Sequence, residues 1–192
     1  MITLGEISKT EAARYMGICT APDEQTAAIL DKYEKIVRSR LKPSYVYREA
    51  DVEFLAEGVH LAGFPAVLTG KSICKHLEGC SRAVVLAATV SAEADRLIRE
   101  TSVVDMAAAF AVDALCSAAI EQTCDIAETE IFGDMPREQR TYRFSAGYGD
   151  LPIELQRDFL EYLNAQRRIG LTCTDSYLLT PTKSVTAIIG LK

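Results

Sequence analysis

Residues 143–150, Arg-Phe-Ser-Ala-Gly-Tyr-Gly-Asp, bring a cation, glycines and a tyrosine together in one short stretch. An arginine can bind a carboxylate through two parallel hydrogen bonds, and an aromatic ring can pack against a cation. Glycine lets the backbone approach a ligand closely and take a positive φ. The stretch therefore suits a small ligand that carries both a carboxylate and a positive centre. A strand end followed by a glycine turn and a helix cap would use the same residues, so both interpretations stay open.

Two other segments match parts of ligand-binding motifs but lack an essential residue. His60 lies in the His-x-x-Gly end of the cobalamin pattern D-x-H-x-x-G, yet the position of the orienting aspartate holds Gly58. Residues 70–72, Gly-Lys-Ser, imitate the end of a P-loop whose first glycine is replaced by Pro65, which has no N–H for a phosphate. We therefore expect a strand or loop histidine at His60 and a helix start near Lys71.

The cysteines predict no metal or disulfide framework. The chain has 6 cysteines, none in a C-x-x-C pair, and no secretion signal, so we interpret them as reduced small hydrophobic residues. Cys74, His76 and Cys80 form the only cluster of soft metal ligands, without zinc spacing or a fourth ligand. We expect a short helix there and no metal.

Length and charge limit the classes of function. At 192 residues the chain suits one domain. Its net charge of -6 and pI of about 5.1 argue against a nucleic-acid groove, which needs a basic surface. No window is apolar and long enough for a membrane span, and the N-terminus lacks a secretion signal, so we expect a cytoplasmic protein.

Capping residues and apolar spacing predict the elements that position these residues. Ser8 and Glu11 form a capping box. The pattern Ser102-x-x-Asp105 predicts the cap of a long alanine-rich helix, central to the fold, that reaches about Glu128. We expect helices over 8–17, 20–42, 71–79, from 91, over 102–128 and over 150–170, and strands over 45–47, 59–62, 82–89, 142–144, 172–180 and 184–191.

The order of these elements predicts the fold class. Strands cluster in the first half and at the C-terminus with helices between, which favours α+β over alternating βαβ. We expect a single domain, 1–192, with a twisted antiparallel or mixed sheet covered by helices. A turn at 181–183 would join the last two strands as a hairpin. Asp113 lies in the apolar run of the long helix, so it belongs either to a polar face or to a functional site.

Several segments together resemble a known family. Residues 143–148 look like the R-x-x-x-G-Y motif of the activation (reactivation) domain of cobalamin-dependent methionine synthase. Residues 169–185 are similar to that domain's I-G-x-x-L-T-E-S-x-x-x-x-P-x-x-S-V pattern, and residues 76–80 and 105–107 look like its free-standing bacterial relatives. The resemblance covers about the last hundred residues and is weaker over 1–69.

This resemblance implies a role in methionine biosynthesis. Members bind S-adenosylmethionine (AdoMet) and use its methyl group, with one electron typically from a flavodoxin, to reactivate cob(II)alamin. By this resemblance Arg143 holds the AdoMet carboxylate and Tyr148 lies near the sulfonium. Backbone groups of Ser145, Ala146 and Gly147 face the ligand.

The resemblance also implies a partner protein. Asp113 matches an acidic position on the long helix that faces the cobalamin, and Ser117 stands one turn on, where longer members carry a glutamate. The aspartate motif of the larger enzymes, in a W-T-P-F-F context, is absent, and so are the catalytic modules and the tyrosine-containing tail. We therefore expect a detached subunit that docks on a separate cobalamin-carrying methionine synthase or corrinoid protein.

Two alternatives to a reactivation subunit remain. The first is a non-enzymatic module, an AdoMet sensor or a corrinoid-protein interaction partner, which the loss of charge at Ser117 favours. The second is a stand-alone AdoMet-dependent methyltransferase. The sequence lacks the glycine-rich βα loop of doubly wound methyltransferases, so this alternative is the weaker.

Overall fold

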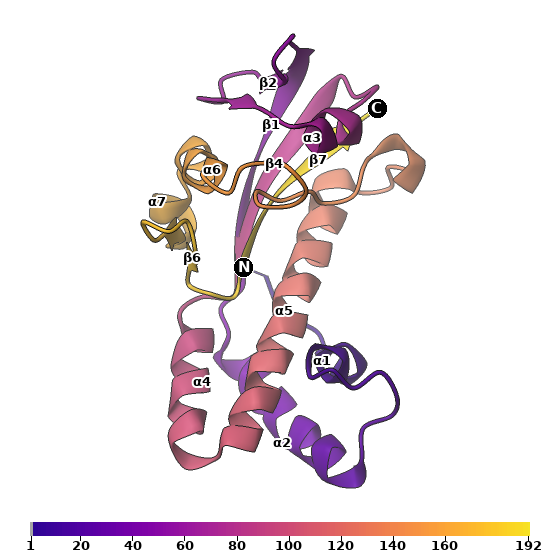
Figure 1. Cartoon of the computed structure of the whole chain (residues 1–192). Coiled ribbons are helices and arrows are strands. Elements are labelled where there is room, and N and C mark those ends of the chain that lie inside the picture. The colour runs from indigo at the N-terminus through magenta and orange to yellow at the C-terminus, as the bar shows by residue number, and fades with distance from the viewer. Residues whose placement is uncertain (1) are drawn as a thin grey trace.

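The fold is organised around one long helix and one sheet (Figure 1). The computed structural model describes residues 2–192. The helices are α1 (Lys9–Tyr15), α2 (Glu24–Arg40), α3 (Lys71–His76), α4 (Glu93–Val104), α5 (Met106–Phe132), α6 (Leu155–Leu163) and α7 (Ala165–Ile169), with a 3₁₀ turn, η1 (Arg137–Gln139). The strands are β1 (Ser44–Phe54), β2 (Val59–Leu61), β3 (Val67–Leu68), β4 (Arg82–Thr89), β5 (Thr172–Cys173), β6 (Leu179–Thr180) and β7 (Ser184–Leu191).

The main sheet has five strands in the order β3-β2-β1-β4-β7, and every neighbouring pair is antiparallel. Strand β4 has the predicted bounds. Ala83, Val85 and Ala87 belong to the core that contains α6, while Ala88 belongs to the core that contains α5. Because both faces of β4 are covered, its sequence is a continuous apolar run. The predicted α+β fold with an antiparallel sheet is confirmed.

Helix α5 connects the two parts of the molecule, as Figure 1 shows. Its N-terminal half packs with α1, α2 and α4, and its C-terminal end reaches Val84 and Ile189 of the sheet. Small side chains such as Ala111, Ala114 and Ala118 are buried along it, which lets the neighbouring helices approach closely. The predicted central, alanine-rich helix is therefore confirmed.

Short polar side chains cap the N-termini of α1, α2 and α5. Ser8 accepts a hydrogen bond from the amide of Glu11 at 3.2 Å, as the capping box predicts. The predicted N-cap of α5, Ser102, is wrong, because Ser102 lies inside α4. The N-cap is Asp105, whose side chain accepts hydrogen bonds from the amides of Ala107 and Ala108. A carboxylate one residue before the helix reaches these unpaired amides directly.

The predicted C-terminal hairpin is wrong. Strand β7 pairs with β4, with Ser184 opposite Thr89, and residues 172–180 fold back on themselves as the two short strands β5 and β6. The turn between β6 and β7 is held by other elements, since the amide of Thr182 binds Asp95 at 3.2 Å. Pairing with the apolar β4 buries far more of β7 than a local hairpin would.

The segment before α6 also differs from the prediction. Residues 142–144 form no strand of their own; single bridges join Arg140 to Leu191 and Phe144 to Ile188 along the outer edge of β7. Helix α6 begins at Leu155, not at residue 150, because residues 147–151 form a turn closed by the bond from the Gly147 amide to the Leu151 carbonyl.

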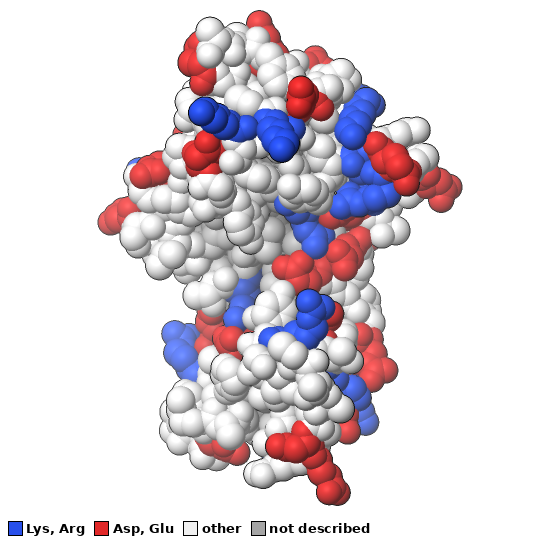
Figure 2. Space-filling view, turned by 45° about the vertical axis from the view of Figure 1, so that its right-hand side comes forward, with Lys and Arg blue, Asp and Glu red and all other residues white. Residues whose placement is uncertain are grey.

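The surface carries charged side chains of both signs, interspersed over the face in Figure 2. Within residues 2–192, no helix is long and apolar enough to cross a membrane.

Candidate functional site

The stretch that starts with Arg143 lines a cavity of about 330 Å³ between α5, α6 and the start of β7. The sequence predicted four of its lining residues, which are Arg143, Ser145, Ala146 and Tyr148. The others are Glu121, Gln156, Leu179, Ser184, Val185 and Thr186. Gly147 is not among the lining residues, and its amide is already bonded to Leu151.

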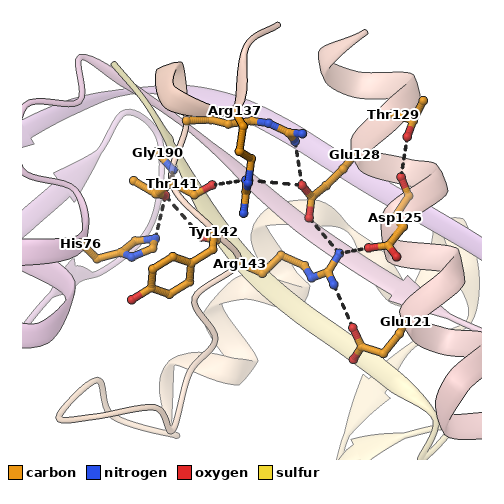
Figure 3. Close-up of polar contacts among 11 residues, drawn as sticks. His76, Glu121, Asp125, Glu128, Thr129, Arg137, Thr141, Tyr142, Arg143 and Gly190 are labelled. Atoms are coloured by element: carbon orange, nitrogen blue, oxygen red, sulfur yellow. Dashed lines mark hydrogen bonds and ion pairs between the residues drawn. The ribbon is translucent and has the colours of Figure 1, made fainter. Parts of the chain in front are cut away.

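Arg143 points from the loop toward α5 and contacts three carboxylates there (Figure 3). Its Nη2 is 2.8 Å from Glu121, and its Nη1 is 3.0 Å from Asp125 and 2.8 Å from Glu128. Burial opposes the charge, but the hydrogen bond to Asp125 and the charges of Glu128 and Glu121 outweigh it and raise the pKa of Arg143. The guanidinium is therefore a permanent cation with a fixed orientation beside the cavity.

Glu128 is the centre of this ionic network. Its side chain is only 12% exposed, and its Oε1 faces Arg143. Its Oε2 lies 2.6 Å from Nη1 of Arg140 and 3.8 Å from Nη1 of Arg137. Three arginines and three carboxylates thus meet on one side of α5, so the network is close to neutral as a whole.

Asp150 fixes the other end of the stretch to α3. Its carboxylate accepts hydrogen bonds from the amides of Lys71 at 2.7 Å and Ser72 at 2.9 Å, which caps that short helix. Gly149 has a φ of 57°, and a Cβ there would lie 2.5 Å from the Ser72 hydroxyl. A glycine is required at this position because the loop touches α3 so closely. Asp150 is thus a helix cap, but for α3 and not, as the sequence had predicted, for the helix that follows the stretch.

Removing this cap is expected to loosen the loop in a pH-dependent way. The bonds from Ser72 and Lys71 lower the pKa of Asp150 below its usual 3.8. A lowered pKa stabilises the folded state above the usual value, and that stabilisation is lost as the pH falls through the lowered pKa. Asp150→Ala should therefore speed hydrogen exchange of the Lys71 and Ser72 amides at pH 7.

The control for this variant is Asp134→Ala, which removes an exposed carboxylate elsewhere. The stability difference between wild type and Asp150→Ala should shrink as the pH is lowered below 3.8. Equal exchange rates in the two variants at pH 7 would contradict the capping role.

Tyr148 lies at the mouth of the cavity. Its side chain is exposed, as expected, with 62% of its surface accessible, and its ring centroid is 6.3 Å from that of Phe144. The amide of Tyr148 donates to the Ser145 carbonyl at 3.1 Å, which closes the turn and sets the direction of the ring. The ring is therefore free to contact a ligand that enters beside Ser145.

Asp113 and Ser117 lie on the same side of α5 as Glu121, toward its N-terminus, and outside the cavity lining. Both contact Lys183, whose Nζ is 2.8 Å from Asp113 and 2.9 Å from the Ser117 hydroxyl. Asp113 is half-buried and forms an ion pair with Lys183, the residue before Ser184 of the cavity. It therefore lies on a polar face of α5. Ser117 is a neutral acceptor for Lys183.

Sequence reasoning missed several of these residues. Glu121 and Asp125 follow Asp113 and Ser117 at intervals of four, so helical spacing alone would have placed them on one face. Lys183 and Gln156 gave no comparable signal, because the turn before β7 and helix α6 reach the site only through the tertiary fold. Gln156 is buried and accepts from Thr186 at 2.6 Å.

The two partial motif matches, at His60 and at residues 70–72, lie in ordinary secondary structure. His60 lies on β2 opposite Glu53, and Lys71 starts α3, as predicted. His76 ends α3, and its Nε2 is 2.8 Å from the Thr141 hydroxyl. Among residues 2–192, no group of three His, Cys, Asp or Glu side chains is arranged to hold a metal ion.

Comparison with known proteins shows a similarity of fold to solved structures. No protein-family model matches the chain, and no curated protein matches it. The crystal structure of the MetH reactivation domain bound to AdoHcy is similar, with a TM-score of 0.67 at 18% sequence identity. The similarity covers 95% of this chain and 66% of that one, so this chain spans just under two thirds of the longer structure. The chain therefore shares the fold of the MetH reactivation domain.

Proposed function

We propose that this protein binds AdoMet in the cavity beside Arg143 and supports the reductive methylation of cob(II)alamin on a separate methionine synthase or related corrinoid protein. The observation that carries this proposal is the assembly of Arg143, Ser145, Ala146 and Tyr148 around one cavity. The fold around that cavity is shared with a domain whose structure contains AdoHcy, the demethylated form of AdoMet.

The charges around the cavity suit this ligand. AdoMet has a carboxylate, an ammonium group and a positive sulfonium. Arg143 provides a cation for the carboxylate, and Glu121, which also lines the cavity, provides an anion for the ammonium group. The two side chains are 2.8 Å apart in the protein, so a zwitterionic ligand would replace one ion pair with two.

The small size of the cavity suits a ligand site that is shared with a partner protein. Its volume of about 330 Å³ lies at the lower end of the range for small-molecule sites. Tyr148 is exposed at the mouth, where its ring can face the sulfonium. The methyl group would then point toward the partner, and the methyl cation plus one electron, from a donor such as flavodoxin, would convert cob(II)alamin to methylcobalamin and leave AdoHcy.

Calorimetric titration with AdoMet tests the first half of the proposal. Saturable binding to this protein, alone or together with the corrinoid protein, is the expected result. Formation of methylcobalamin, followed by its absorbance with reductant, AdoMet and both proteins present, tests the second half. No AdoMet binding in either titration would reject the proposal.

Tyr148→Ala should weaken AdoMet binding more than AdoHcy binding. A cation near an aromatic ring at an exposed site contributes about 1 kcal/mol, or about fivefold in affinity, and AdoHcy lacks the positive sulfonium. Tyr142→Ala is the matched control, because Tyr142 is 63% exposed, lies on the same loop and does not line the cavity. An equal loss for both ligands would place the ring away from the sulfonium.

A non-enzymatic role is the second candidate. Lys183 neutralises Asp113, and Ser117 carries no charge, so the expected partner-facing side of α5 is less acidic than the family resemblance implies. An AdoMet sensor or corrinoid-protein interaction module would bind AdoMet with the affinity losses above but would form no methylcobalamin in the complete assay.

A further inference from the structure

A second cavity, of about 590 Å³, lies on the opposite side of the loop that carries Arg143. Phe144 bridges to Ile188, and in this extended segment successive side chains point to opposite sides. Arg143 thus faces α5, while Tyr142 lies beside His76 of α3, as Figure 3 shows. The two cavities share no lining residue.

The lining of this second cavity is basic. It contains Lys75, Arg137, Arg140 and Lys192, which come from α3, η1, the following loop and the end of β7. No aspartate or glutamate lines it, although the chain has a net charge of -6. Figure 2 shows Lys and Arg side chains gathered on the upper right of the molecule. Four cations from separate segments therefore converge on one hollow.

These cations retain unused hydrogen-bond donors. Within residues 2–192, Lys75 forms no ion pair. Nη1 of Arg140 lies 2.6 Å from Glu128, and Nη1 of Arg137 lies 3.8 Å from Glu128 and donates to the Thr141 carbonyl at 2.9 Å. An anion in the cavity would supply acceptors for these groups.

The remaining wall is aromatic. The His76 ring lies 4.8 Å from the rings of both Tyr142 and Phe144, measured between centroids. Burial lowers the pKa of His76, so the ring is neutral at pH 7 and adds no charge. Tyr142 is 63% exposed and presents its ring to a ligand. The cavity thus offers cations and a flat apolar surface side by side.

We propose that this cavity binds a nucleoside diphosphate or a related phosphate-bearing anion with a flat ring. The phosphates would contact Lys75, Arg137 and Arg140, and the ring would pack against Tyr142. The volume of about 590 Å³ is in the range of small-molecule sites. This site is independent of the proposed AdoMet function, because AdoMet has no phosphate and carries a positive centre.

Calorimetric titration with ADP, pyrophosphate and adenosine, without divalent cations, tests this site. ADP should bind most tightly, pyrophosphate next and adenosine least, and ADP binding should weaken as salt is raised. The double variant Lys75→Ala/Arg137→Ala should lower ADP affinity at least about tenfold, because two charged contacts are lost. Absence of ADP binding, or adenosine binding as tightly as ADP, would overturn the proposal.

Matched variants distinguish specific binding in this cavity from nonspecific attraction of ADP to positive charge. Lys71→Ala/Arg99→Ala removes the same charge from exposed positions outside the cavity and should leave ADP affinity within about twofold. Tyr142→Ala should weaken ADP binding, and Tyr148→Ala should not. Equal losses in the two double variants, or a loss only in Tyr148→Ala, would show that ADP does not occupy this cavity.

Discussion

Replacing Arg143 with alanine is expected to lower AdoMet affinity at least about tenfold, because a charged hydrogen-bond pair contributes about 1.5–3 kcal/mol. Arg143 is 22% exposed, lines the cavity and is held in place by Asp125 and Glu128, so little entropy is lost when it binds a carboxylate. Calorimetric titration of wild type and variant with AdoMet measures the effect. Unchanged binding would remove Arg143 from the site.

The same substitution also affects stability, and a second variant separates the two effects. Without Arg143, less positive charge offsets the repulsion among the carboxylates of Glu121, Asp125 and Glu128. Arg143→Lys keeps the positive charge but loses the planar pair of donors. It should unfold at a urea concentration closer to wild type than Arg143→Ala does, while its AdoMet affinity stays low. Recovery of full affinity in the lysine variant would show that charge alone holds the ligand.

Glu128→Gln is expected to destabilise the fold by about 3 kcal/mol, since removing one partner of a buried ionic network leaves the other charges uncompensated. Glu128 is 12% exposed, accepts hydrogen bonds from Arg140 and Arg143, and forms a longer ion pair with Arg137. Glutamine keeps the size of the side chain, so the loss reflects charge and not a cavity. Urea unfolding followed by circular dichroism gives the change in the free energy of unfolding.

Glu138→Gln, an exposed change in η1, is the control and should alter the free energy of unfolding by less than about 0.5 kcal/mol. Because Glu128 does not line the AdoMet cavity, Glu128→Gln should keep AdoMet binding within a few-fold of wild type at temperatures where it is folded. A stable Glu128→Gln variant would mean that the arginines find other partners when the carboxylate is gone.

Local signals predicted the positions of most helices and of the buried strand β4. The Ser8 cap, the apolar run of β4 and the alanine-rich spacing of α5 each depend on neighbouring residues, and each was found where expected. The pairing of β7 with β4 was not found, because a short turn at 181–183 looks the same whether it joins a hairpin or leads to a distant strand. Which strand β7 pairs with depends on the apolar area buried, which spacing does not encode.

The sequence by itself determined the chemical character of the site: a cation, an exposed tyrosine and glycine turns in one stretch, with Asp113 and Ser117 on a long helix. Only the tertiary structure decided which side chains and backbone amides contact the residues of this stretch. Arg143 meets Glu121, Asp125 and Glu128 because α5 passes beside the loop, and Asp150 caps α3 although 79 residues separate it from Lys71. Long-range charge pairs arise from packing of distant segments, so local patterns in the chain cannot specify them.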